Sequence, residues 1–275
     1  MGKRFLVGFV ITVALFAIAR RTSSNRPGRI EVEAGGLHLS HVEVKEQVGP
    51  GEPEVRLSVA PAGSGEAWVL SRSSRDGMVA HRPMARAETG EWTATLPDLG
   101  KGKRIEYAFS VTGERRVIAR LPAGKDDFLL VKYKGQYSMP VLVLHIVFMF
   151  GSFYFMVQTM MGAVQILRER EGKLITVRMM RLAMICVFIG GWPLGFILNY
   201  QRFGPVWEGF PFGLDITDNK TQIIFLFWLT AMILVRGSFF GKGEQFDTLG
   251  DRGFAWAMVT CFIVSMFLYL VPHSL

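Results

Sequence analysis

Long stretches without a charged side chain are the feature that most constrains this chain of 275 residues. These runs occupy residues 5–19, 140–167, 182–198, 221–235 and 253–271. A helix of about 20 apolar residues is long enough to cross the hydrocarbon layer of a bilayer. Most of the charged residues lie between the first and the second run. The sequence therefore predicts a membrane protein with one separate soluble region, and it excludes a wholly soluble, a disordered or a disulfide-stapled chain.

The C-terminal half is predicted to be a four-helix transmembrane domain over residues 140–275. Its expected spans are residues 140–167, 182–198, 221–240 and 253–271. Together with the β-sandwich expected in the soluble region, this gives the fold class membrane α plus all-β. The lipid bilayer is one expected partner of the chain. Both cysteines, Cys186 and Cys261, fall inside apolar runs, so neither can staple the soluble region.

Basic residues predict the orientation of these spans. Two of the connections, residues 168–181 and 236–252, together carry eight Lys and Arg, whereas the connection over residues 199–222 carries two. The positive-inside rule places the basic connections in the cytoplasm. Residues 20–139 are then expected in the periplasm or at the cell exterior, in a multi-pass protein of the bacterial inner membrane. The net charge of +8 serves this topology and does not indicate nucleic-acid binding.

The first apolar run, residues 1–19 with its basic flank, has two open interpretations. Its short length and the small residues Ala17 and Ala19 fit a cleaved signal peptide. The pair Arg20 and Arg21 directly after it is an awkward flank for export and fits a retained signal-anchor helix.

Residues 28–134 show the pattern of an antiparallel β-sandwich. Short runs of alternating apolar and polar residues are separated by Gly, Pro and charged pairs, as expected for strands with one buried face. The eight expected strands are residues 30–33, 37–44, 55–59, 67–71, 92–96, 105–111, 117–121 and 128–133. Odd-numbered positions of residues 55–59 and 105–111 should face the core.

The stretches Trp68–Arg72, Arg82–Met84, Gly90–Pro97 and Arg104–Tyr107 carry a resemblance to known modules. Residues 37–134 resemble the immunoglobulin-like and fibronectin-III-like modules found beside carbohydrate-active and cell-surface proteins. This resemblance implies a sandwich that serves as a spacer, a docking surface or a binding module. Trp68 and Trp92 fit the core alternation, which argues against a sugar-binding face. His38, His41 and His81 are expected at the surface.

The first long span has a stripe of polar, small and Met side chains. Its members, spaced as on one helix face, are His145, Met149, Ser152, Met156, Thr159, Met160 and Ala163. The stripe predicts a packing face toward other helices. A second interpretation uses His145 with Met149 or with His273 as ligands of haem b or copper. Otherwise no cofactor is expected.

The loop before residue 221 has the most distinctive sequence. Its aromatic residues Trp207, Phe210 and Phe212 are interleaved with Gly and Pro, and polar residues follow them: Asp215, Asp218, Asn219 and Lys220. Thr217 or Asp218 is expected to cap the next helix. These seven residues are the predicted partner-docking site.

The phrase from Pro211 to Thr221 resembles a motif, PFG-x-D-x-TDNKT, of uncharacterised bacterial inner-membrane proteins of similar layout. This resemblance implies no activity. Residues 190–195 combine glycines with Pro193, so an interrupted helix with close helix contacts is expected there.

Catalytic motifs are missing: the sequence has no phosphate-binding glycine loop, no G-x-S-x-G and no H-E-x-x-H. The leading interpretation is a non-catalytic accessory or assembly subunit of a larger membrane complex, with other membrane-protein subunits as partners. The alternatives are an electron-transfer protein with haem or copper, and a sensor that binds a ligand in the sandwich.

Overall fold

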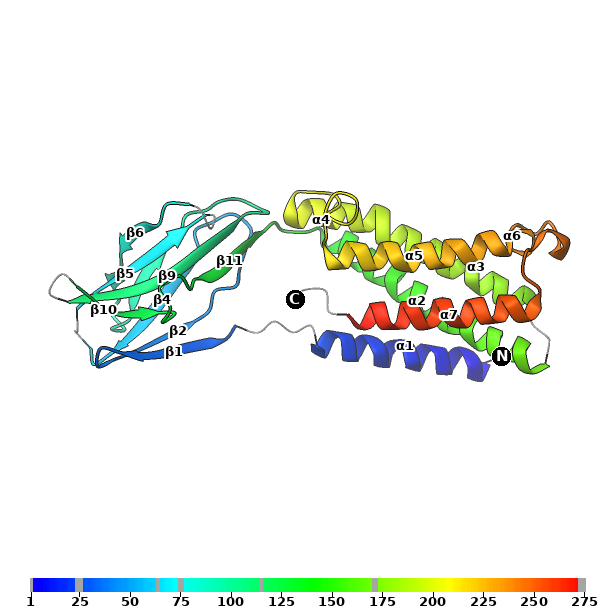
Figure 1. The fold of residues 1–275 in the computed structure, drawn as a ribbon, viewed down its shortest axis with the longest axis horizontal. Coiled ribbons are helices and arrows are strands. Elements are labelled where there is room, and N and C mark those ends of the chain that lie inside the picture. Colours follow the sequence, from blue (N-terminus) through cyan, green and yellow to red (C-terminus); the bar gives the residue numbers. More distant parts are fainter. Residues whose placement is uncertain are drawn as a thin grey trace. The chain divides into compact units, whose positions relative to one another are not determined.

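The computed structural model describes residues 2–22, 27–62, 65–73, 77–113, 116–169 and 173–271. The chain divides into two compact units (Figure 1). A β unit holds residues 25–136 together with residues 201–204, and a helical unit holds the remainder.

Two sheets form the β unit. A five-stranded sheet has the order β1-β2-β4-β8-β7, and a six-stranded sheet has the order β3-β11-β9-β5-β6 with β10 paired to β9. The strands of the first sheet are β1 (Arg29–Ala34), β2 (Leu37–Val42), β4 (Glu54–Ala60), β7 (Ala85–Arg86) and β8 (Trp92–Thr95). Those of the second are β3 (Glu46–Val48), β5 (Glu66–Arg72), β6 (Ala80–Pro83), β9 (Arg104–Gly113), β10 (Arg116–Leu121) and β11 (Leu129–Lys134).

The predicted alternation is confirmed where it was most regular. On β9 the side chains of Ile105, Tyr107, Phe109 and Val111 lie in the core between the sheets, as odd-numbered positions should. Each predicted strand corresponds to an observed one, and the short strands β3, β6 and β7 are additional. The β-sandwich of the prediction is therefore present.

Trp68 departs from the prediction. Its neighbours on β5, Ala67 and Val69, are buried in the core, so the indole between them points to the opposite face of the sheet. The predicted alternation placed Trp68 on the core face, but the strand has the opposite phase, with Ala67 and Val69 facing inward. Trp92 on β8 is half-buried and packs against the core from its rim.

His41 also departs from the prediction, because its ring is buried and not at the surface. Nδ1 lies 2.7 Å from the carbonyl oxygen of Arg56, and Nε2 lies 2.7 Å from the hydroxyl of Tyr107. Since a carbonyl oxygen only accepts, Nδ1 carries the proton and Nε2 accepts from Tyr107. The Tyr107 oxygen in turn accepts from the backbone N–H of Val44 at 3.1 Å. The neutral imidazole thus joins three strand segments.

Burial lowers the pKa of His41, although the bond to the Arg56 carbonyl and the charge of Glu43 act in the opposite direction. The unfolded chain therefore takes up a proton near pH 6.5, where the folded chain does not. Stability should be full above pH 6.5 and should fall as the pH drops below it. We expect calorimetry of the full chain to give a lower melting temperature for the sandwich at pH 5 than at pH 7.5. An equal shift in a His41→Gln variant would contradict this assignment.

The helical unit contains the helices of the chain, except that the last three residues of α4 belong to the β unit. They are α1 (Gly2–Thr22), α2 (Met139–Glu169), α3 (Lys173–Ile189), α4 (Gly195–Phe203), α5 (Ile216–Leu234) and α7 (Asp251–Leu270), with the short α6 (Arg236–Phe240) and the 3-10 turn η2 (Glu244–Phe246) between the last two. Figure 1 shows α2, α5 and α7 running side by side with α1 and α3 in one bundle. Three helical segments of the described residues are long and apolar enough to cross a membrane: residues 139–168, 173–203 and 251–270.

The second of these segments contains the predicted interruption. A single π-helical turn, η1 (Gly190–Leu194), joins α3 to α4 and includes Pro193. The absence of a side chain at Gly190 matters, because a Cβ there would lie 2.9 Å from the Met149 sulfur. A Cβ on Gly191 would lie 2.6 Å from Thr221. The close helix contacts expected for residues 190–195 are therefore confirmed.

The predicted span over residues 221–240 is divided in the structure. Helix α5 begins earlier, at Ile216, and it ends at Leu234. The carbonyl oxygen of Leu234 accepts from the backbone N–H groups of Thr248 and Leu249 instead of continuing the helix. Gly237 of α6 packs closely against the carbonyl oxygen of Gly243, so the chain turns back on itself directly after α6 and does not continue as a helix.

Two pairs of buried polar side chains inside the bundle are bonded across helices, which satisfies groups that an apolar interior would otherwise leave without a partner. The Trp228 indole N–H donates to the Ser265 hydroxyl at 2.9 Å, which joins α5 to α7. The hydroxyls of Ser152 and Tyr269 lie 2.7 Å apart and join α2 to α7. The buried members of the predicted stripe on α2 are Ser152, Met156, Thr159 and Ala163, so its packing role is confirmed at these positions.

Candidate docking loop

The loop between α4 and α5 is the candidate functional site, and the first turn of α5 organises it. Asp215 is the N-cap of α5, and its carboxylate accepts from the backbone N–H groups of Thr217 at 2.8 Å and Asp218 at 3.0 Å. The expectation that Thr217 or Asp218 caps this helix is therefore wrong. The helix begins one turn earlier than its apolar run suggests, because its first two turns are polar.

Asp218 is buried and fixes the loop to the helices. Its carboxylate accepts from the Asn199 side-chain amide of α4 at 3.1 Å and from the backbone N–H of Glu208 at 2.7 Å. A carboxylate that accepts from backbone N–H groups forms charge-assisted bonds, which are stronger than neutral ones. Asp218 thus connects the middle of α4, the loop and the start of α5.

The next two residues make further internal bonds. The Asn219 side-chain oxygen accepts from the backbone N–H of Phe210 at 2.7 Å. The Lys220 ammonium donates to the carbonyl oxygen of Val271 at 2.9 Å, at the C-terminal end of α7. A cation there interacts favourably with the partial negative charge of the helix end. Three consecutive polar residues therefore hold the loop and the end of α7 in place.

Trp207 and Gly209 complete the scaffold of the loop. The Trp207 ring stacks on Trp192 of η1 with centroids 6.2 Å apart, and its N–H donates to the carbonyl oxygen of Phe210 at 3.3 Å. A Cβ on Gly209 would lie 2.8 Å from both the Trp207 ring and the Asp218 side chain. Only glycine leaves room for this arrangement.

The remaining apolar side chains of the loop point away from the protein. We define the apolar tip as Val206, Phe210, Phe212 and Leu214. Their side chains are exposed, and Phe212 and Leu214 are 82% and 86% exposed. The backbone of this segment forms a hydrogen-bonded turn, in which the N–H groups of Phe212 and Gly213 both donate to the carbonyl oxygen of Gly209 at 3.0 Å. The loop therefore presents apolar side chains on a fixed backbone.

The seven predicted docking residues thus separate into two groups. The polar residues Asp215, Asp218, Asn219 and Lys220 make bonds within the chain, and Trp207 packs inward. Phe210 and Phe212 belong to the apolar tip.

The proposed cofactor residues His145 and Met149 contact the π-helical turn η1. The Nδ1 atom of His145 lies 2.9 Å from the carbonyl oxygen of Gly190, and Met149 contacts the same glycine one helical turn later. Both residues thus pack against η1. His273 lies outside the described residues. Within the part of the chain that the structure describes, no three His, Cys, Asp or Glu residues are arranged to hold a metal ion.

A second polar cluster closes the opposite end of the bundle. The Lys173 ammonium at the start of α3 lies 3.3 Å from the Asp247 carboxylate and 3.0 Å from that of Asp251 at the start of α7. Burial alone would raise the pKa of Asp247, but the hydrogen bonds from Ser238 and the charge of Lys173 lower it overall. This cluster joins α3, α7 and the connection between α6 and α7.

No family model matches the chain, and no curated protein matches it either. The resemblances of the sandwich and of the loop motif therefore remain predictions.

Sequence reasoning missed three residues of this site: Asn199, Gly209 and Leu214. Asn199 is separated from Asp218 by the whole loop, so only the fold brings the two together. Gly209 lies between Trp207 and Phe210, and its spacing from two aromatic residues is a signal that could have indicated a tight backbone.

Proposed function

We propose that this protein is a non-catalytic, multi-pass protein of the bacterial inner membrane that serves as an accessory or assembly subunit of a larger membrane complex. The sandwich lies in the periplasm or at the cell exterior, and the apolar tip contacts another membrane-protein subunit. The exposure of Phe212 and Leu214 on a hydrogen-bonded loop carries this proposal.

The fixed backbone of the loop favours a protein partner. Insertion of apolar side chains into lipid requires their composition but no fixed geometry. Recognition of a protein surface benefits from preorganisation, because less conformational entropy is lost on binding. Asp218 and Asn219 hold the loop beneath Phe210 and Phe212, which is the arrangement that specific docking requires.

Helix α5 completes a four-span topology in this proposal. Its first turn is tied to the middle of α4 and to the end of α7 through Asp218 and Lys220. The carbonyl oxygen of its last residue, Leu234, accepts from the backbone N–H of Thr248 in the connection between α6 and α7. The same connection is joined to the start of α3 by the ion pair of Asp247 with Lys173. Since α5 joins the same two ends of the bundle as the three apolar segments, it should cross the same membrane layer. Its polar first turns then lie at the headgroup level.

Helix α1 is best explained as a retained anchor. Leu15 is buried in the bundle core, and the Phe16 ring stacks on Phe150 of α2 with centroids 3.6 Å apart. The Arg4 guanidinium donates to the Gln165 side chain at 2.8 Å and to the carbonyl oxygen of Gln158 at 2.5 Å. Cleavage after residue 19 would remove all of these contacts.

Cysteine labelling tests this topology. In a chain whose Cys186 and Cys261 are replaced by alanine, a Glu208→Cys variant should react with an impermeant maleimide in spheroplasts. A Lys242→Cys variant should react only after the membrane is opened, because it lies in a basic connection. Both positions are exposed, so accessibility from the correct side is the only difference.

Labelling of position 242 in sealed spheroplasts would contradict the orientation and the external location of the sandwich. An intact mass that lacks residues 2–19 would contradict the retained anchor.

A further inference from the structure

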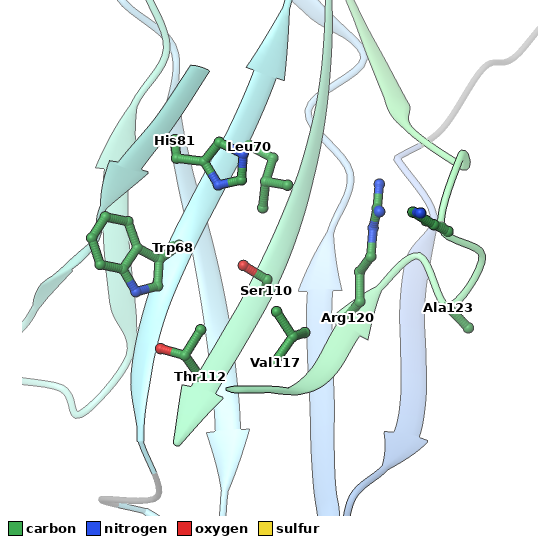
Figure 2. A pocket seen from close by; sticks show the side chains of 9 residues that line it. Trp68, Leu70, His81, Ser110, Thr112, Val117, Arg120 and Ala123 are labelled. Carbon is green, nitrogen blue, oxygen red and sulfur yellow. The ribbon is translucent and has the colours of Figure 1, made fainter. Parts of the chain in front are cut away.

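The outward face of the six-stranded sheet carries a hollow that the docking loop does not explain. Its volume is about 540 Å³, and Trp68, Leu70, Ser110 and Val117 lie along its floor and walls (Figure 2). Ligand-binding pockets typically measure roughly 300–1,000 Å³ and combine an apolar lining with a few polar groups. The hollow lies wholly within the β unit, so its ligand does not depend on the proposed docking function of the loop.

The register of the strands explains how the hollow is built. Trp68 on β5 lies opposite Ser110 on β9, and Ser110 lies opposite Arg120 on β10. The indole and the guanidinium therefore originate two strand spacings apart, roughly 10 Å. Figure 2 shows the two side chains on opposite sides of the hollow, with Ser110 between them. Thr112, two residues further along β9, adds a second hydroxyl.

Arg120 is held in position before any ligand arrives. Its guanidinium donates to the carbonyl oxygen of Asp127 at 3.2 Å and lies 5.0 Å from the centre of the Phe128 ring. Lys125 adds a second positive charge to the lining. No acidic side chain is among the nine described residues that line the hollow. The carboxylates of Asp126 and Asp127 act on Arg120 from outside the lining. The lining itself carries the positive charges of Arg120 and Lys125, which are complementary to an anion.

We propose that this hollow binds an acidic oligosaccharide, a chain of sugars that carries carboxylates. The weakly positive C–H groups of a sugar ring pack on the negative face of an indole, which Trp68 supplies. Ser110 and Thr112 supply hydroxyls for the sugar hydroxyls. Arg120 supplies a planar donor pair that matches a carboxylate on a neighbouring sugar.

The position of the hollow within the sheet disfavours a peptide. Peptides that bind sheets commonly add a strand at an edge, where backbone groups are unpaired. The hollow lies over β5 and β9, and both strands are paired on each side. A peptide backbone above this face would find no row of unpaired N–H and C=O groups, whereas a sugar needs only side-chain contacts.

Calorimetric titration of the full chain in nanodiscs tests the proposal. The acidic probes are tetragalacturonate and tetramannuronate, and the comparison ligands are neutral maltotetraose and the peptide tetraglutamate. We expect saturable binding of at least one acidic sugar, and weaker binding of both comparison ligands. Trp68→Ala and Arg120→Gln should each weaken binding about tenfold or more, and Trp68→Phe should weaken it less.

The matched control is Arg56→Gln, which removes an exposed positive charge from β4 of the other sheet. It should leave binding unchanged. The proposal is overturned if neither acidic sugar binds saturably, if Trp68→Ala binds like the unaltered chain, or if Arg56→Gln weakens binding as much as Arg120→Gln. Equal or tighter binding of tetraglutamate would assign the hollow to acidic peptides and would also overturn it.

Discussion

An Asp218→Ala variant should lose the ordered docking loop while the bundle stays folded. The buried carboxylate accepts from Asn199 and from the backbone N–H of Glu208, and both donors would lose their partner. An unsatisfied group costs about 1–3 kcal/mol when it is fully buried, and these half-buried donors should cost less than that each. Hydrogen exchange of the amides from Glu208 to Leu214 should therefore become much faster. Co-purification of the partner subunit should also fall at least tenfold.

The control for this experiment is Asp215→Ala, one turn away on the same segment. Asp215 is the N-cap, and its loss should cost about 1 kcal/mol without releasing the loop. Equal hydrogen exchange in the two variants would show that Asp218 does not hold the loop.

A Phe109→Ala variant should strongly destabilise the sandwich. The Phe109 ring is fully buried and packs against His41 and Tyr107, with centroids 4.8 and 5.6 Å away. Truncation of a buried phenylalanine costs about 3–5 kcal/mol, because the lost contacts leave a cavity. Pulse proteolysis of the full chain in urea, read from the band of the intact sandwich, measures this loss.

Trp92→Ala provides the comparison. The Trp92 ring is half-buried at the rim of the core, so its truncation should cost about half as much as that of a fully buried aromatic residue. A Trp92→Ala variant that is less stable than Phe109→Ala would contradict this description of the core.

The sequence predicted the regular parts of the fold from their periodicity. The alternation along β9 was sufficient to identify Ile105, Tyr107 and Phe109 as core residues. The same reasoning failed at Trp68, because the alternation along residues 67–71 was assigned to the core in the wrong phase. Its buried neighbours Ala67 and Val69 are smaller, yet they define the inward face.

The docking loop shows a different limit of sequence reasoning. Asp218, Asn219 and Lys220 look like exposed binding residues, because charged and amide side chains are mostly found at surfaces. Their internal roles depend on Asn199, Phe210 and Val271, which lie 19, 9 and 51 residues from their partners. The break after Leu234 was equally hidden, because its carbonyl oxygen is taken by a connection that follows fourteen residues later.

Photo-crosslinking from the apolar tip tests the docking proposal most directly. A benzophenone amino acid at Phe212 should form, in growing cells, a crosslink to one other membrane protein, and the product should disappear in the Asp218→Ala background. The matched control is Phe240, which is 61% exposed in α6 at the opposite end of the bundle, and it should give a different pattern. If Phe212 forms only lipid adducts, only a crosslink to a second copy of this chain, or the same products as Phe240, then the apolar tip does not dock another subunit.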